Sequence, residues 1–244
     1  MNNEVVNWQD RLAEQAKEVA ALERPSISQI STRAGVLTYQ KQQVPGNKLL
    51  CVVIASVFEN KYFGGKPFDP NNYQSPVCFA LSPTGDDMAP HEDSTDKQSE
   101  SCATCEQSKW HSAGGGSKGK ACKEVRRLAL LPASVVKDGN IATAEMAVLS
   151  IPVTSVRNWA TYINGLAAEY ARPPWGMLTE VRTEPDPRSQ FQIKFEAKGI
   201  VEDEYLPMLY KRVQSAVDVL MTPYDDTGVI AQAPDPLPGK PKKY

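Results

Sequence analysis

A hydrophilic, glycine-containing stretch between residues 83 and 119 constrains this chain more than any other feature. The stretch includes a GGG run and lacks the apolar residues that a segment needs to pack a core of its own. Cysteines nevertheless surround it, because Cys78 precedes it, Cys102 and Cys105 lie within it, and Cys122 follows it. We therefore expect a ligand that cysteines bind to order the segment.

The spacing of these cysteines predicts a structural zinc site. Cys102 and Cys105 form a C-x-x-C knuckle, which lets two thiolates face one metal ion. Cys78 and Cys122 would complete a closed tetrahedral site, and the free energy of Zn²⁺ binding would fold the segment. In a reducing compartment, an odd set of five cysteines fits metal ligation plus one unligated thiol better than disulfides. The unligated thiol is Cys51, within the apolar run LLCVVIASVF.

Other uses of the cysteines compete with this reading. His111 lies six residues after Cys105 and could replace Cys78, which would give a site of three cysteines and one histidine. An iron–sulfur cluster uses the same four thiolates, but no other feature indicates electron transfer. A C-x-x-C redox pair normally opens a helix beside a βαβ unit, which this sequence does not predict. His91, in an acidic stretch, is expected to be solvated.

Hydrophobic periodicity predicts a mainly β protein with flanking helices, of the α+β class. Residues 1–24 predict an amphipathic N-terminal helix, residues 25–222 one domain with a zinc-binding insertion at about 76–123, and residues 223–244 a flexible Pro-rich tail. The order of three or more strands, a helix and two strands suits a five-stranded OB-like barrel, the oligonucleotide-binding type. A split α+β sheet or a two-layer sandwich would give a similar order.

Composition and motifs exclude several classes of function. The formal net charge of −2 provides no global basic field. No apolar run approaches the roughly 18 residues of a membrane span, and the N-terminus lacks the layout of a signal peptide, so we expect a cytoplasmic protein without membrane contact. The sequence contains no P-loop, GxSxG, HExxH or zinc-deaminase signature, so we expect no enzymatic activity.

Cations and aromatic residues gather around the last cysteine. Between residues 109 and 127 the only acid is Glu124, whereas the preceding stretch is acidic. Binding of single-stranded nucleic acid needs cations for the phosphates and flat rings for the bases, and this combination favours it, although each residue alone could equally pack the fold or form a solvated face. The candidate contacts are Lys109, Trp110, Lys118, Lys120, Lys123, Arg126 and Arg127, with Tyr62, Phe63, Phe68 and Tyr73 along a polar loop.

The runs PVCFALSP and SCATCEQSKWHSAGGGSKGKACKEVRRLALLP carry a resemblance over about residues 50–132. They resemble the central region of zinc-containing bacteriophage single-stranded-DNA-binding proteins of the replicative, OB-fold type. The resemblance implies a barrel with a zinc lobe and DNA in a basic, aromatic cleft between them. It places Cys78, Cys102, Cys105 and Cys122 at metal positions and Lys118, Lys120, Lys123 and Arg126 in the basic run.

Two departures accompany the resemblance. Related sequences tend to have Gly where this chain has His111, and the acidic C-terminal tail that recruits polymerase is replaced by PLPGKPKKY. We expect a sequence-tolerant single-stranded-DNA-binding protein that acts in phage DNA replication or recombination, in the host cytoplasm, with replication or recombination proteins as further partners. The alternative is a zinc-stabilised protein-interaction or assembly module that binds no nucleic acid.

Overall fold

The structure is a computed structural model that describes residue 8, residues 11–12, residue 15, residues 28–65 and residues 75–224. The predicted N-terminal helix lies within the described part only at four positions, where the chain is helical and the side chains are exposed. Most of that helix and the predicted tail beyond Tyr224 lie outside the described residues.

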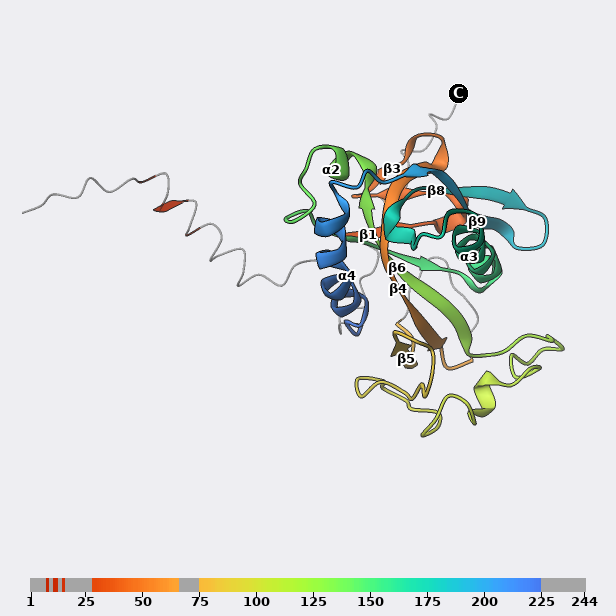
Figure 1. The fold of residues 1–244 in the computed structure, drawn as a ribbon. Coiled ribbons are helices and arrows are strands. Elements are labelled where there is room, and N and C mark those ends of the chain that lie inside the picture. The colour runs from red at the N-terminus through yellow and green to blue at the C-terminus, as the bar shows by residue number, and fades with distance from the viewer. Residues whose placement is uncertain (1–7, 9–10, 13–14, 16–27, 66–74, 225–244) are drawn as a thin grey trace, which may run out of the picture.

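Nine strands form one curled, open, mixed sheet in the described part of the chain (Figure 1). Their order across the sheet is β3-β2-β1-β7-β6-β4-β8-β9, with β5 paired to β4. The β1–β7 pair is parallel and the other pairs are antiparallel. The strands are β1 Ser28–Ser31, β2 Thr38–Tyr39, β3 Gln42–Gln43, β4 Lys48–Tyr62, β5 Cys78–Ser82, β6 Lys123–Pro132, β7 Ala147–Ile151, β8 Met177–Asp186 and β9 Gln190–Ile200. The prediction of a mainly β, α+β fold is confirmed.

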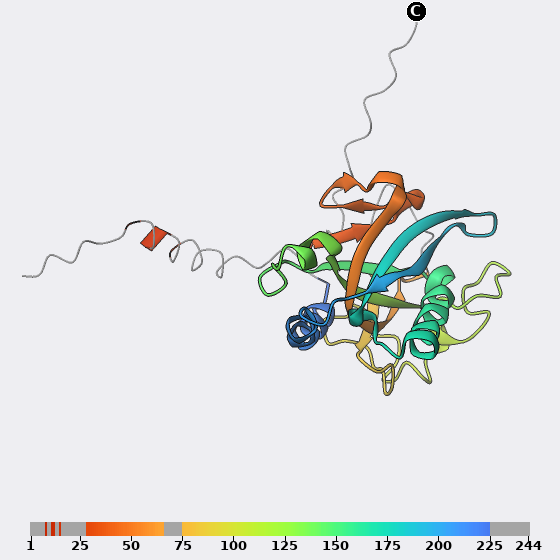
Figure 2. The ribbon, with the colours of Figure 1, turned by 45° about the horizontal axis from the view of Figure 1, so that its top comes forward.

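Helices cover both faces of this sheet (Figure 2). They are α2 Ala133–Lys137, α3 Val153–Gly165, which continues as a π-helical turn Leu166–Tyr170, and α4 Leu206–Leu220. Short 3-10 turns span Arg33–Gly35, Pro45–Asn47, Glu106–Ser108 and Pro174–Gly176. No helix among the described residues is both long and apolar enough to cross a membrane.

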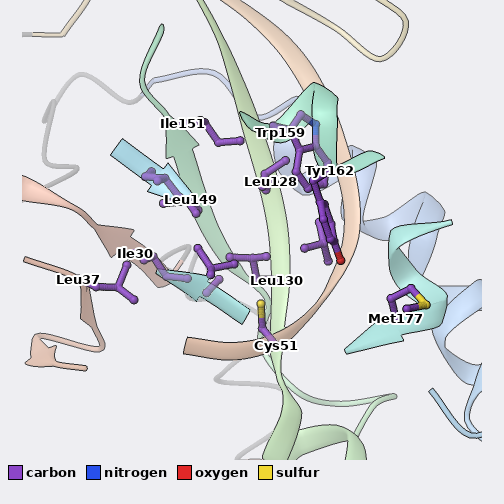
Figure 3. Packing of buried hydrophobic residues seen from close by; sticks show 14 of the residues in the cluster. Ile30, Leu37, Cys51, Leu128, Leu130, Leu149, Ile151, Trp159, Tyr162 and Met177 are labelled. Atoms are coloured by element: carbon purple, nitrogen blue, oxygen red, sulfur yellow. The ribbon is translucent and has the colours of Figure 1, made fainter. Parts of the chain in front are cut away.

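The longest strand, β4, is buried on both faces, which explains its continuous apolar run. Val53 packs in one cluster with Trp159 and Tyr162 of α3, and Figure 3 shows part of this cluster. The neighbouring Val52 points to the opposite face, into a second cluster with Leu209 of α4. Cys51 is fully buried in the first cluster, as the sequence predicted.

Residues 83–122, called the lobe below, leave the sheet between β5 and β6 and project from its end as irregular chain (Figure 1). The lobe has a single 3-10 turn, Glu106–Ser108, and no strand. Its buried residues are Ser94, Cys105 and Cys122. The lobe therefore has no hydrophobic core, and cysteines occupy most of its interior.

Candidate metal centre and nucleic-acid interface

The sheet fixes the two cysteines at the base of the lobe. Cys78 is the first residue of β5 and pairs opposite Tyr62, and Cys122 directly precedes β6, whose Lys123 pairs opposite Lys61. Because β4 lies between β5 and β6, both cysteines are held at the same end of the sheet. Residues 44 positions apart in the chain, 78 and 122, are thus brought to one place by strand pairing.

Backbone hydrogen bonds bring the C-x-x-C knuckle to this base. The Cys122 amide donates to the Gln107 carbonyl at 2.8 Å, and the Ser108 amide donates to the Cys105 carbonyl at 3.0 Å. These bonds tie the turn after Cys105 to the start of β6, so the knuckle faces the strand cysteines.

All four predicted ligands, Cys78, Cys102, Cys105 and Cys122, line one cavity of about 10 Å³. A space of this size holds roughly one water-sized occupant. The remaining lining residues are Asn60, Tyr62, Phe79, Ala80, Pro90, Gln98, Gln107 and Ser108. As placed, no three or more His, Cys, Asp or Glu side chains in the described part of the chain form a group that could hold a metal ion. The fold therefore brings the four cysteines to one cavity but does not arrange their sulfur atoms as a complete coordination sphere.

Burial favours the protonated form of two of these thiols. Burial raises the pKa of Cys122 to about 12, with a further contribution from the neighbouring Cys102 thiol. Burial also raises the pKa of Cys102, and the nearby Cys78 and Cys105 add to the shift. The Cys102 and Cys122 thiols are therefore neutral at pH 7 without a cation, and binding of a divalent ion would release protons.

The donor set fits zinc. Four cysteine sulfurs around a space for one ion match the closed, tetrahedral, all-cysteine sites that zinc prefers. The buried Ser108 Oγ lies at the cavity wall beside the Cys122 sulfur and has no other hydrogen-bond partner among the described residues, which leaves it free to donate to a thiolate there. When bound, zinc would supply the cross-link that holds the knuckle to the strands.

Neither histidine lines the cavity. His111 is exposed, has a positive φ of 71°, and its amide bonds to the Lys118 carbonyl, so its placement lends no support to a site of three cysteines and one histidine. His91, which was predicted to be solvated, is only partly exposed, because its ring stacks on Phe79 at 4.9 Å and its Nδ1 accepts from the Asp93 amide. Aromatic packing outweighs the polarity of its neighbours in sequence.

One ligand-supporting residue was not predicted from the sequence. Asn60 is buried, lines the cavity, and its side chain hydrogen-bonds to the Cys102 thiol. The alternation of β4 would have found it, because Asn60 shares a face with Tyr62, the residue paired to Cys78.

Arg127 does not belong to an external surface, which corrects its place among the predicted nucleic-acid contacts. It is 7% exposed, and its guanidinium forms an ion pair with Glu59 at 2.7 Å. It also donates to the carbonyls of Leu220 and Thr222, at the end of α4, and lies over the Tyr224 ring. Arg127, on β6, therefore links β4 to the C-terminal end of α4 inside the protein.

Arg126 is half-buried between the sheet and the lobe. Its guanidinium carbon lies 3.6 Å from the centre of the Phe58 ring. The chain turns over the same ring at Gly85, where φ is +86° and an added Cβ would approach the ring to 2.8 Å. Only glycine fits this turn. Arg126 and the lobe therefore contact the same ring of the sheet, and part of the Arg126 side chain remains exposed.

The four predicted lysines lie on the lobe and at the first residue of β6. Lys109 and Lys120 are neutralised by exposed ion pairs with Glu106 and Glu124, both at 2.5 Å. Lys118 and Lys123 have no carboxylate partner among the described residues, although Lys123 donates to a backbone carbonyl. Ion pairs with nearby glutamates therefore neutralise two of the four predicted lysines.

Trp110 is the most exposed large apolar residue in the described part of the chain, at 70%. The Lys120 ammonium lies 5.4 Å from the centre of its ring, a cation–π contact that fixes the two side chains together. Of the other predicted aromatics, Tyr62 lines the cysteine cavity and Phe63 is partly buried. Phe68 and Tyr73 lie outside the described residues.

The chain was compared with protein-family models, with curated proteins and with solved structures. None of them matches it. The residues of the chain itself therefore carry the functional argument.

Counting reactive thiols should separate the four cavity cysteines from Cys51. With zinc bound, we expect no rapid reaction of the native protein with a thiol reagent, and after chelation we expect four cysteines to react. The fifth should react only in denaturant, because Cys51 stays fully buried in the core of the sheet, where burial raises its pKa to about 12, whereas loss of zinc exposes the cysteines of the lobe. Rapid reaction of any thiol in the zinc-bound native protein would contradict four-cysteine ligation.

Proposed function

We propose that this chain is a non-enzymatic protein that binds single-stranded DNA with little sequence preference and acts in phage DNA replication or recombination, in the host cytoplasm. The supporting observation is the exposed Trp110, held against Lys120 on a lobe at whose base four cysteines line one cavity. A large aromatic ring with most of its surface exposed suits base stacking.

The cations beside this ring suit the phosphate backbone. Lys118 and Lys123 have no carboxylate partners among the residues described, and they lie on either side of Lys120 in the sequence. A bound strand would also compete for Lys109 and Lys120, whose exposed ion pairs cost little to exchange, about 0–1 kcal/mol each. Such contacts are sequence-independent and weaken with salt.

The sheet offers the second wall of the proposed cleft. We assign β4 and β6–β9, which curl around α3, to an OB-like barrel that is extended by β1–β3 at one edge. In this assignment zinc has a structural role and takes no part in chemistry. The strand would lie between the lobe and the barrel, with Arg126 at their junction.

A fluorescence-anisotropy titration with labelled oligo-dT tests the proposal. We expect saturable binding whose affinity falls as salt rises, and weaker binding to a duplex of the same length. Affinity that is absent, or that does not change with salt, would overturn the proposal.

Replacement of Trp110 provides a sharper test. Trp110→Ala should weaken oligo-dT binding about 5- to 150-fold, since stacking contributes roughly 1–3 kcal/mol per base. Tyr210→Ala is the matched control, because Tyr210 is also an exposed aromatic, at 67%, but lies on α4 away from the lobe. Equal affinities of the two variants would remove Trp110 from the interface.

A protein-interaction module is the second candidate. The arm of the lobe that precedes the knuckle, residues 86–100, has six acids against the single cation Lys97. Such an arm would repel DNA and could dock a basic partner. If this function is correct, the protein should bind neither single-stranded nor duplex DNA, and pull-downs should recover a specific protein.

A further inference from the structure

A second hollow lies at the end of α3, and the proposed DNA interface does not use it. It has a volume of about 270 Å³, and its lining residues are Tyr162, Gly165, Leu166, Glu169, Tyr170, Phe195, Glu196 and Ala197. Three aromatic rings and two carboxylates thus face one space between the π-helical turn and β9. We call it the aromatic hollow.

The walls of the aromatic hollow are fixed by packing. Tyr162 and Phe195 stack with their ring centres 5.9 Å apart, and the Tyr162 hydroxyl is hydrogen-bonded to Thr179 at 2.6 Å. Tyr170 closes the π-helical turn and remains 39% exposed, and the next residue, Ala171, is left-handed with a φ of 50°. π-Helical turns place side chains at positions that a regular helix would not, and here Glu169 and Tyr170 lie at the rim.

The charge of the aromatic hollow is negative. Glu196 is neutralised by Arg182 and Lys198, each at 2.6 Å. Glu169 is exposed and has no ion-pair partner among the described residues. An unpaired carboxylate beside aromatic faces favours a cation on an apolar stem, such as a lysine side chain, and disfavours a phosphate.

We propose that residues 236–244 of this same chain occupy the aromatic hollow. Their sequence, PLPGKPKKY, has three lysines, three prolines and no acidic side chain. Proline-rich segments bind aromatic-lined grooves because their extended conformation costs little entropy to order. A lysine of the segment would place its ammonium beside Glu169 while its stem and the neighbouring prolines cover Tyr170 and Phe195.

The connection to the rest of the chain permits this contact. Tyr224 is held at the base of the lobe by Arg127 and by the Phe79 ring. Lys240 follows Tyr224 by 16 residues, which span up to about 50 Å when extended. A domain of this size is about 45 Å across, so an extended segment of this length matches the width of the domain.

Carbodiimide cross-linking of the full-length protein tests the proposal, because it joins a carboxylate to a lysine amine only when the two are in contact. We expect a link from Glu169 to Lys240, Lys242 or Lys243, found by mass spectrometry of the digested protein. Glu169→Gln should abolish it, and Glu204→Gln, at another exposed carboxylate, should leave it unchanged. Tyr170→Ala, which keeps the carboxylate, should lower its yield about fivefold, the effect of losing roughly 1 kcal/mol of cation–π contact.

Three outcomes would overturn the proposal. They are the absence of a Glu169 link, links that spread evenly over the exposed carboxylates, and links that join two copies in a mixture of ¹⁵N-labelled and unlabelled protein. The result is independent of DNA binding, because none of the residues involved belongs to the proposed DNA interface.

Discussion

Chelation of zinc is expected to unfold the lobe and to leave the β-sheet folded. The sheet has two apolar clusters of its own, whereas the lobe buries only Ser94, Cys105 and Cys122. Structural zinc contributes about 10–16 kcal/mol of apparent binding free energy in small zinc-dependent peptides. The few buried side chains of the lobe cannot contribute a stabilising free energy of that size.

Hydrogen exchange measured by mass spectrometry checks this expectation. After chelation, amides of the lobe such as Cys122, which donates to Gln107, should lose protection, while those of the β4–β6 pair should keep theirs. Cys105→Ser should lose the metal, and Cys51→Val, at a buried site outside the cavity, should retain one zinc per chain. A metal-free lobe that remains equally protected would refute the role assigned to zinc.

Arg127→Ala is expected to lower the free energy of unfolding by about 3–5 kcal/mol, because it takes the closest cation from the buried Glu59 carboxylate and leaves only Lys61, at 3.3 Å, to neutralise it. Burial by itself raises the pKa of Glu59, yet Lys61 and Arg127 overcome this effect and hold that pKa below its usual range. The pair therefore stabilises the protein above the normal pKa range of glutamate, and this stability is lost as the pH falls through the lowered pKa.

Urea denaturation gives the measurement, and two further variants make it specific. The double variant Glu59→Met with Arg127→Met should be less destabilised than Arg127→Ala, since it leaves no unpaired buried charge. Lys118→Ala should leave the free energy of unfolding unchanged and should weaken oligo-dT binding. The reason is that Lys118 is exposed and has no carboxylate partner among the described residues. Unchanged stability of Arg127→Ala would contradict the internal role of this residue.

The predicted sheet and lobe show how far sequence patterns extend. The alternation and apolar runs of β4, β6 and β9 predicted strands, and the polar composition of residues 83–119 predicted a segment without a core. The two-residue strand β3 was not predicted, because it is too short to show a period. The parallel pairing of β1 with β7 joins residues 119 positions apart, from Ser28 to Ala147, and no local signal reports it.

The sequence by itself predicted that four cysteines come together, because the polar stretch between them lacks the apolar residues to order itself, and that Cys51 belongs to the core. Only the tertiary structure decided which of two adjacent arginines is available to a ligand. Arg127 meets Glu59, 68 residues away, on the α4 face, whereas Arg126 points to the opposite face, against Phe58. In the sequence, Arg126 and Arg127 are two equivalent cations. The register of β6 against β4 turns Arg127 to the interior, and this register is fixed by pairing between segments that are distant in the sequence.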